Sequence, residues 1–300
     1  MDYEDIQTFL MIVETGSISR ASDRLFLSQS SVSQRLQHLE DVLGVRLLLR
    51  RKGIKNVELT KAGKAFISIA RRYTELMNEA DALKRERIRP YLSIGATDTL
   101  TTNLFLPLMQ ALVRDYPDTD YKFRVKLSEA IYDDVETGKL DVGLVMDYYK
   151  RRDVLVRPVY TEPMVVISRS ELPSQDGVVA VSALSKEKEI RQWWGADYIR
   201  WHEEVLDPDT RSGLNVNTVS LLISMLQIDQ TWSIAPTSVA AEIARTCPVF
   251  TCKIAENPPE RVIYLITPRL PKSGSEEMLA IFSARLEEHL AQMTAEKTDR

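Results

Sequence analysis

One stripe of side chains near the start of the chain is suited to hydrogen bonding with the edges of nucleic-acid bases. Ser31, Gln34, Arg35 and His38 recur at helical spacing within 28–43. Glutamine and arginine can each form two hydrogen bonds to a base edge, and a serine at a helix start can bind a phosphate group. This pattern indicates a helix that reads double-stranded DNA. The alternative is a three-helix bundle with an ordinary polar surface helix.

The neighbouring sequence predicts the helices that would hold this stripe in place. Apolar residues at i, i+3, i+4 and i+7 within 6–13 predict a first helix, which Gly16 ends. Ser17 can cap a second short helix, and Ser28 can cap a third that stops at Gly44. Two helices, a break and a donor-rich third helix make a helix-turn-helix, whose last helix enters the major groove of DNA.

Two short strands are predicted next, over 45–49 and 57–59, and the basic tip between them is typical of a wing. The segment 20–72 holds 12 basic and 4 acidic residues, so it could attract a polyanion although the net charge of the chain is −4. We therefore predict a winged helix-turn-helix domain over 1–59. Its candidate DNA-binding residues are Ser28, Gln29, Ser30, Ser31, Ser33, Gln34, Arg35, Arg50, Arg51, Lys52 and Lys55.

A long helix is predicted after the wing. Charged positions flank its apolar seam, so we expect a dimer-forming coiled-coil linker helix over 60–89 rather than a core helix, and Pro90 ends it. The seam residues recur at spacings of 3 and 4, as coiled coils require, and are Ala62, Phe66, Ile69, Tyr73, Leu76, Ala80 and Leu83.

Several short motifs of the N-terminal region follow one another in a fixed order. They are Glu14-Thr15-Gly16-Ser17, Arg20-Ala21-Ser22, Leu27-Ser28-Gln29-Ser30-Ser31-Val32-Ser33, Leu43-Gly44-Val45 and Leu59-Thr60-Lys61-Ala62-Gly63. With these motifs, residues 4–66 resemble the DNA-binding region of LysR-type transcriptional regulators. That family commonly has Pro-Ala in place of Ser30-Ser31 and Arg-Gln in place of Gln34-Arg35, so the operator sequence cannot be borrowed from relatives.

After the linker, short apolar strands alternate with helices, which predicts an α/β region with a parallel sheet. The expected strands are 91–96, 121–127, 140–146, 160–167, 178–181, 198–201, 232–235 and 262–267. The expected helices are 104–115, 130–138, 219–226, 238–245 and 276–289. The family resemblance extends more weakly across 91–290. It implies a two-lobed α/β effector domain like a periplasmic binding protein, with lobe I over 90–161, lobe II over 162–255, and a return to lobe I with a C-terminal helix over 256–300.

A hydroxyl cluster follows the first strand of this region. Thr97, Thr99 and Thr101 surround Asp98 at a predicted helix start, where free N–H groups favour a carboxylate. Each hydroxyl could instead cap its own helix, and Asp98 would repel an anion or favour a ligand that carries an amine. By resemblance, the same cleft between the lobes receives Asp147, Arg200, Trp201, Asn217 and Thr218. Trp193 and Trp194 are further aromatic candidates.

Three other functions compete with this interpretation of the sequence. Cys247 and Cys252 suggest a redox-sensing regulator of the same fold, but no basic cluster activates either thiol. A ligase-repressor enzyme would need a glycine- and arginine-rich nucleotide loop, and the sequence has none. A transport-type solute-binding protein would carry a signal peptide, whereas Met1 is followed by acidic residues. Two cysteines and three histidines also exclude a disulfide framework or a zinc cluster.

We therefore predict a cytoplasmic, non-enzymatic LysR-type regulator without a cofactor, a metal or a membrane segment. Its expected partners are operator DNA and a small, anionic effector, an organic acid first and an amine-bearing acid second. The resemblance implies a homodimer through the linker helix and a homotetramer beyond it, with RNA polymerase as a candidate partner. Ligand binding between the lobes would then change how the assembled protein bends its promoter.

Overall fold

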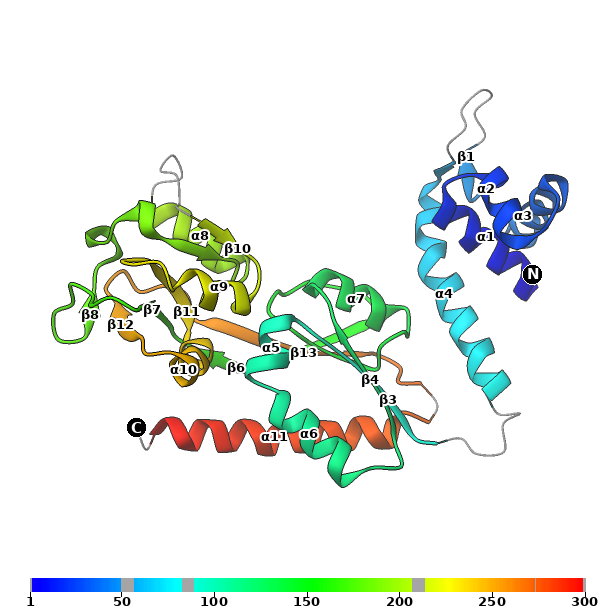
Figure 1. Cartoon of the computed structure of the whole chain (residues 1–300). Helices are drawn as coiled ribbons and strands as arrows, with labels where there is room; N and C mark the ends of the chain where they lie inside the picture. Colours follow the sequence, from blue (N-terminus) through cyan, green and yellow to red (C-terminus); the bar gives the residue numbers. More distant parts are fainter. Residues whose placement is uncertain (1, 50–56, 83–88, 207–213, 273, 299–300) are drawn as a thin grey trace. The chain divides into compact units, whose positions relative to one another are not determined.

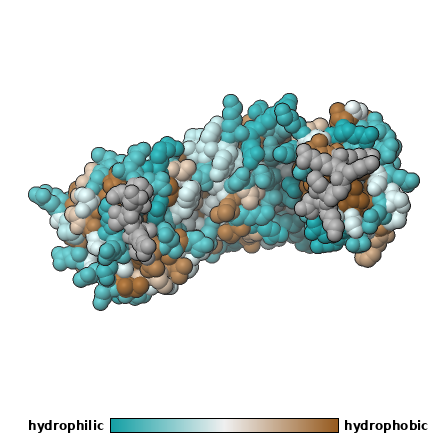
Figure 2. All heavy atoms as spheres, turned by 90° about the horizontal axis from the view of Figure 1, so that it is seen from above, coloured by the Kyte–Doolittle hydropathy of each residue, from teal (hydrophilic) through white to brown (hydrophobic). Residues whose placement is uncertain are grey.

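A computed structural model describes residues 2–49, 57–82, 89–206, 214–272 and 274–298. The chain forms two compact units. The first holds Met1–Arg89, and the second holds Pro90–Val135 and Leu140–Arg300. The face seen in Figure 2 is mainly hydrophilic and is broken by separate hydrophobic patches.

The first unit has the predicted helix-turn-helix. Its helices are α1 (Tyr3–Thr15), α2 (Ile18–Leu25) and α3 (Gln29–Leu43), followed by a two-stranded antiparallel sheet of β1 (Leu48–Leu49) and β2 (Glu58–Leu59) and by α4 (Lys61–Ala82), as Figure 1 shows. Gly16 and Gly44 adopt the left-handed backbone conformation, φ 63° and 68°, that ends α1 and α3. The two strands are shorter than predicted.

The core of this unit modifies the prediction for the linker helix. Phe66 of α4 is buried among the apolar side chains of α1 to α3, and its ring lies 5.4 Å from that of Phe9. Ala70 is also buried, whereas Ile69 and Leu76 are exposed. Phe66 therefore belongs to the core of its own domain rather than to a free seam, because the first turns of α4 lie against the helix-turn-helix. Leu83 lies outside the described residues.

Lobe I of the second unit is a five-stranded sheet in the order β4-β3-β5-β13-β6. The strands are β3 (Tyr91–Ala96), β4 (Asp120–Val125), β5 (Val142–Val145), β6 (Val154–Glu162) and β13 (Arg261–Pro268). β3 pairs in parallel with β4 and β5, and β13 runs antiparallel to β5 and β6. Four helices complete the lobe: α5 (Asp98–Asn103), α6 (Leu106–Asp115), α7 (Ser128–Glu136) and α11 (Glu276–Thr298).

The two faces of this sheet bury different helices. α6 and α11 share one apolar cluster with β3, which includes Leu92, Phe105 and Phe282, and α7 packs on the other face through Ile131 and Tyr132 (Figure 1). Gly95 allows α7 to approach the sheet closely, because a Cβ atom at this position would lie 3.1 Å from Cγ2 of Ile131 in α7 and 2.4 Å from a methyl group of Leu140. This packing fixes the start of α7 beside the ends of β3 and β4.

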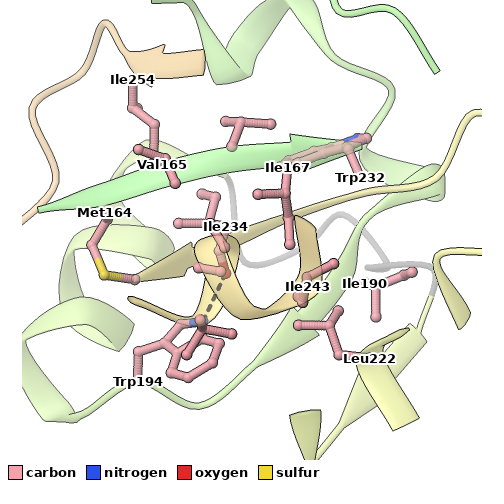
Figure 3. Packing of buried hydrophobic residues seen from close by; sticks show 14 of the residues in the cluster. Met164, Val165, Ile167, Ile190, Trp194, Leu222, Trp232, Ile234, Ile243 and Ile254 are labelled. Carbon is pink, nitrogen blue, oxygen red and sulfur yellow. Dashed lines mark hydrogen bonds between the residues drawn. The ribbon is translucent and has the colours of Figure 1, made fainter. Parts of the chain in front are cut away.

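Lobe II contains a four-stranded sheet in the order β11-β7-β12-β8 and a parallel pair of β9 and β10. Its strands are β7 (Met164–Ser168), β8 (Val178–Val179), β9 (Ile190–Gln192), β10 (Leu214–Val216), β11 (Trp232–Pro236) and β12 (Phe250–Ile254), and its helices are α8 (Ala196–Val205), α9 (Val219–Met225) and α10 (Thr237–Thr246). Figure 3 shows its core, in which Trp194 Nε1 donates a hydrogen bond to the backbone oxygen of Ile234 at 2.7 Å.

One sequence prediction in this lobe is wrong. The sequence predicts a strand over 198–201, but these residues lie within α8. Tyr198 and His202 are buried one helical turn apart, while Arg200 faces solvent, so the short apolar run is one side of a helix rather than a strand. The sequence prediction also missed the short strands β9 and β10, and its single strand over 160–167 is the end of β6 followed by β7.

Candidate DNA-reading helix and interlobe pocket

The start of α3 is held by its own serines. Ser28 Oγ accepts a hydrogen bond from the backbone N–H of Ser31 at 3.1 Å, and it lies 2.7 Å from Ser30 Oγ and 2.8 Å from Ser31 Oγ. Gln29 Nε2 donates to Ser19 Oγ of α2 at 3.1 Å. These bonds fix the junction between α2 and α3, and they leave Ser30 exposed at the first turn of the predicted DNA-reading helix.

Side chains on the outer face of α3 form contacts with α1 that the sequence does not suggest. Arg35 forms an ion pair with Glu4 of α1, and His38 Nδ1 lies 2.8 Å from Asp5 Oδ2. Gln34 is exposed and Ser33 is half-buried. Arg50, Arg51, Lys52 and Lys55 of the predicted wing tip lie outside the described residues.

A buried carboxylate anchors the strand that leads into the wing. Glu40 Oε1 accepts hydrogen bonds from the backbone N–H groups of Leu47 and Leu48 at 2.8 and 3.2 Å, and Glu40 Oε2 accepts one from Arg46 at 2.6 Å. Burial alone would raise the pKa of Glu40, but these three donors together lower the pKa below its ordinary value.

A pocket of about 670 Å³ lies where the strands of both lobes end, and we call it the interlobe pocket. From lobe I it receives the residues that follow β3, β4 and β5, and from lobe II those that follow β9 and β10. This is where α/β proteins bind ligands, at the carboxyl ends of their strands. Its lining residues are Thr97, Asp98, Thr99, Val125, Lys126, Leu127, Ser128, Glu129, Ala130, Asp133, Met146, Asp147, Tyr149, Gln192, Trp193 and Asn217.

Three buried polar atoms in this lining have no hydrogen-bond partner among the described residues. They are Thr97 Oγ1, Ser128 Oγ and Gln192 Oε1. Thr97 and Ser128 are each 5% exposed, and Gln192 is 3% exposed. Thr97 precedes α5, yet its hydroxyl does not cap that helix. Buried polar atoms are nearly always paired with protein or water, so three unpaired atoms around one pocket favour a polar ligand or ordered water there.

Five of the nine sequence-predicted effector residues line this pocket: Thr97, Asp98, Thr99, Asp147 and Asn217. The other four lie elsewhere. Thr101 donates to the backbone oxygen of Thr97 within its own helix, and Thr218 caps α9. Trp201 Nε1 donates to the backbone oxygen of Glu256, and Arg200 forms an exposed pair with Asp197.

A second pocket, of about 590 Å³, adjoins the first and shares Met146, Asp147, Tyr149 and Trp193 with it. Arg200 lines this second pocket. Asp147 Oδ1 accepts a hydrogen bond from the backbone N–H of Ala196 at 3.3 Å, so a lobe I carboxylate meets the start of the lobe II helix α8. The prediction for Arg200 depended on a strand in its segment, and the helix moves this side chain to the adjoining pocket.

Comparison with known proteins agrees with both the helix-turn-helix and the domain that contains the interlobe pocket. Residues 3–64 match the model of the "bacterial regulatory helix-turn-helix protein, lysR family", and residues 85–282 match that of the "LysR substrate binding domain". The chain belongs to the LysR family. It is therefore a LysR-type DNA-binding transcriptional regulator with an effector-binding domain, and this family is one of regulators rather than enzymes.

The individual relatives share low sequence identity with this chain. The HTH-type transcriptional regulator SoxR of an Arthrobacter strain is 28% identical over 177 residues, 59% of this chain and 61% of that protein. HdfR of Yersinia pestis is 27% identical over 234 residues, 76% of this chain and 78% of that protein. The structure of a full-length OxyR variant from Pseudomonas aeruginosa superposes with a TM-score of 0.62 at 20% identity, covering 97% of this chain and 94% of that one. The structural likeness concerns the fold alone.

Among the pocket-lining side chains that sequence reasoning missed are Ser128 and Gln192, which carry two of the three unpaired buried atoms. The sequence offered a signal for Ser128, since it directly follows the second predicted strand of lobe I. Gln192 gave none, because the short strand β9 was not predicted.

Cys247 and Cys252 are free thiols, and Cys252 is buried in β12. None of the described helices has an apolar stretch long enough to cross a bilayer.

Proposed function

We propose that this LysR-type regulator binds a small organic acid in the interlobe pocket and that the bound acid changes how its DNA-binding domains engage an operator. The observation that carries the proposal is the set of unpaired atoms Thr97 Oγ1, Ser128 Oγ and Gln192 Oε1. A ligand with oxygen and nitrogen atoms would supply the partners that these buried groups lack.

The start of α7 supports an acid at the lobe I side of the pocket. The helix begins after Leu127, whose side chain cannot accept hydrogen bonds from the first N–H groups. Ser128, Glu129 and Ala130, which open α7, all line the pocket. The first N–H groups of α7 and the positive end of the helix dipole favour a carboxylate, although Glu129 already lies in this turn, and the Ser128 hydroxyl can donate a further bond.

DNA recognition is assigned to α3 and the wing. We propose that Gln29, Ser30, Ser31, Gln34 and Arg35 face base edges in the major groove, while Ser28, Ser33 and the basic wing tip hold phosphates. The exposed Ile69 and Leu76 of α4 support a homodimer through the linker helix. A tetramer of two such dimers, and contact with RNA polymerase, follow from the family resemblance.

A ligand screen tests the effector half of the proposal. The full-length protein is screened against small metabolites by thermal shift, and hits are titrated by calorimetry against wild type, Ser128→Ala and Thr97→Val. Each variant should lose about tenfold in affinity, because each removes one buried hydrogen bond to the ligand. Ser283→Ala is the matched control, since its hydroxyl bonds the backbone of its own helix α11.

A DNA experiment then links the pocket to regulation. Binding sites are selected from a random DNA library, and affinity for the selected site is measured with and without the acid. Wild type should respond to the acid, and Ser128→Ala should bind the same DNA without that response. If no acid among the hits needs Ser128 or Thr97, the proposed site is wrong.

A further inference from the structure

We infer that the effector of the interlobe pocket is an amphipathic zwitterion, an acid that also carries an amine and an apolar group, rather than a purely anionic acid. This inference rests on the proposed function and narrows its ligand class. Three features of the pocket lead to it: its charge, the chemistry of its unpaired atoms, and its exposed apolar rim.

The charged side chains around the pocket are mostly acidic. Four carboxylates line it, and Lys126 is its one ammonium group among the described residues. Lys126 is already paired with Asp134 outside the pocket, and Asp133 is paired with Arg151 at 3.2 Å. Asp98, Glu129 and Asp147 have no cationic partner within the described parts of the chain. A dicarboxylate would meet three carboxylates that lack a cation, of which Asp147 alone accepts a backbone hydrogen bond from Ala196, whereas a ligand amine would be attracted by them.

The unpaired atoms differ between the two lobes. Gln192 Oε1 from lobe II can only accept a hydrogen bond, and a ligand N–H or O–H group would supply the donor that it lacks among the described residues. Thr97 and Ser128 from lobe I carry hydroxyls that can donate to a carboxylate, beside the uncapped start of α7. The pocket therefore offers hydroxyl donors from lobe I, and acceptors in the lobe I carboxylates and in Gln192 of lobe II. A molecule with an acid and an amine matches both.

Apolar side chains complete the pocket. Val125, Leu127 and Trp193 line it, and all three are exposed, Leu127 to 82%. Trp193 is directed there because the next residue, Trp194, is fixed in the lobe II core by its bond to Ile234. An apolar or aromatic group on the ligand would cover these side chains and remove apolar surface from water on both molecules.

Matched probes test this class. Phenylalanine carries the acid, the amine and an apolar ring, 3-phenylpropanoate lacks the amine, and phenethylamine lacks the acid. A panel of apolar amino acids is titrated by calorimetry into the full-length protein, each beside its own amine-free and acid-free analogues. The best amino acid should bind at least about tenfold tighter than either analogue, since each charged hydrogen bond lost costs a factor of this order.

Variants assign the amine to the carboxylates. Asp98→Asn and Asp147→Asn should each reduce the preference for the amine-bearing probe over its amine-free analogue. Asp118→Asn, on the loop before β4 and away from the pocket lining, is the control and should leave the preference unchanged.

The outcomes separate the inference from the proposed function. If amine-free acids bind as tightly as amino acids and still need Ser128, the zwitterion class is wrong and the acid site stands. If the acid-free amines bind as tightly as the amino acids, the inferred role of the carboxylate is wrong. If no acid binds in a manner that depends on Ser128 or Thr97, the proposed function itself is wrong.

Discussion

Arg261 and Glu162 form a buried ion pair where the two connecting strands leave lobe I. Arg261 Nε lies 2.9 Å from Glu162 Oε1, and the side chains are 1% and 0% exposed. Glu162 ends β6, just before the chain enters β7 of lobe II, and Arg261 begins β13 on the way back. Each therefore stands at a crossing between the lobes.

The same pair is bonded to both lobes. Arg261 donates to Thr99 of lobe I at 3.4 Å and to Ser238 of lobe II at 3.1 Å, and Glu162 Oε2 accepts from the backbone N–H of Ser238 at 2.7 Å. Thr99 also lines the interlobe pocket. A ligand that changes the position of Thr99 would thus act directly on the contact that joins α5, the crossing strands and α10.

The first prediction concerns this pair. Arg261→Met should destabilise the effector domain by about 3–5 kcal/mol, because it leaves Glu162 as a buried charge without its cation. Urea unfolding followed by tryptophan fluorescence measures this, since all four tryptophans, Trp193, Trp194, Trp201 and Trp232, lie in the lobe II segment.

Two further variants control that measurement. Arg157→Met breaks an exposed pair with Glu287 and should cost no more than about 1 kcal/mol. The double variant Arg261→Met with Glu162→Leu should be less destabilised than Arg261→Met alone, because the unpaired charge is gone. Equal losses of unfolding free energy in Arg261→Met and Arg157→Met would contradict a structural role for the buried pair.

The second prediction concerns pH and Glu40. Because the pKa of this carboxyl is lowered in the folded state, its contribution to stability is present above the ordinary value of 4.5 and is lost as the pH falls through the lowered folded value. Glu40→Gln should weaken protection of the Leu47 and Leu48 amides by about 1–3 kcal/mol at neutral pH. Hydrogen exchange measures the effect, and the difference from wild type should shrink in acid. A difference that persists unchanged below the lowered pKa would contradict the assignment.

Local chemistry explains why the DNA-binding unit could be predicted well from the sequence. The glycines at 16 and 44 end helices by their own backbone freedom, and Ser17 and Ser28 each cap the helix that they precede. The apolar spacing of Val32, Leu36 and Leu39 likewise appears as the buried face of α3. All of these signals lie within one helical turn of the feature that they determine.

The pocket could be predicted only in part, because much of it depends on contacts between distant segments. The first-strand loop was found from its position after an obvious strand. Gln192 is brought to the pocket by the pairing of β9 with β10, two three-residue strands. Arg261 pairs with Glu162 across 99 positions of sequence, and no local sequence pattern at either residue predicts this pairing.

The third prediction concerns DNA reading by Arg35. Arg35→Ala should cost about 1–3 kcal/mol of affinity for the selected operator and much less for random DNA, as expected for loss of a bidentate base contact. Because Arg35 is paired with Glu4, Glu4→Ala should leave operator binding intact or strengthen it. Fluorescence anisotropy at matched salt measures both, with exposed Gln7→Ala as the control. Equal losses on operator and random DNA would show that Arg35 only holds α1 against α3.

The fourth prediction separates assembly from folding in α4. Leu76 is 59% exposed and Phe66 is 6% exposed, so substitutions at the two positions should have different effects. Leu76→Glu should keep the domain folded and prevent dimerisation, because it places a charge on the apolar seam. Phe66→Ala should instead destabilise the domain by about 3–5 kcal/mol through the cavity that it leaves beside Phe9. Sedimentation measures mass, and circular dichroism measures unfolding of the helical domain.

Lys64→Glu, at an exposed position earlier on the same helix, is the control for added charge. If Leu76→Glu sediments at the wild-type mass, Leu76 does not lie in the dimer interface, and the exposed part of α4 has another role.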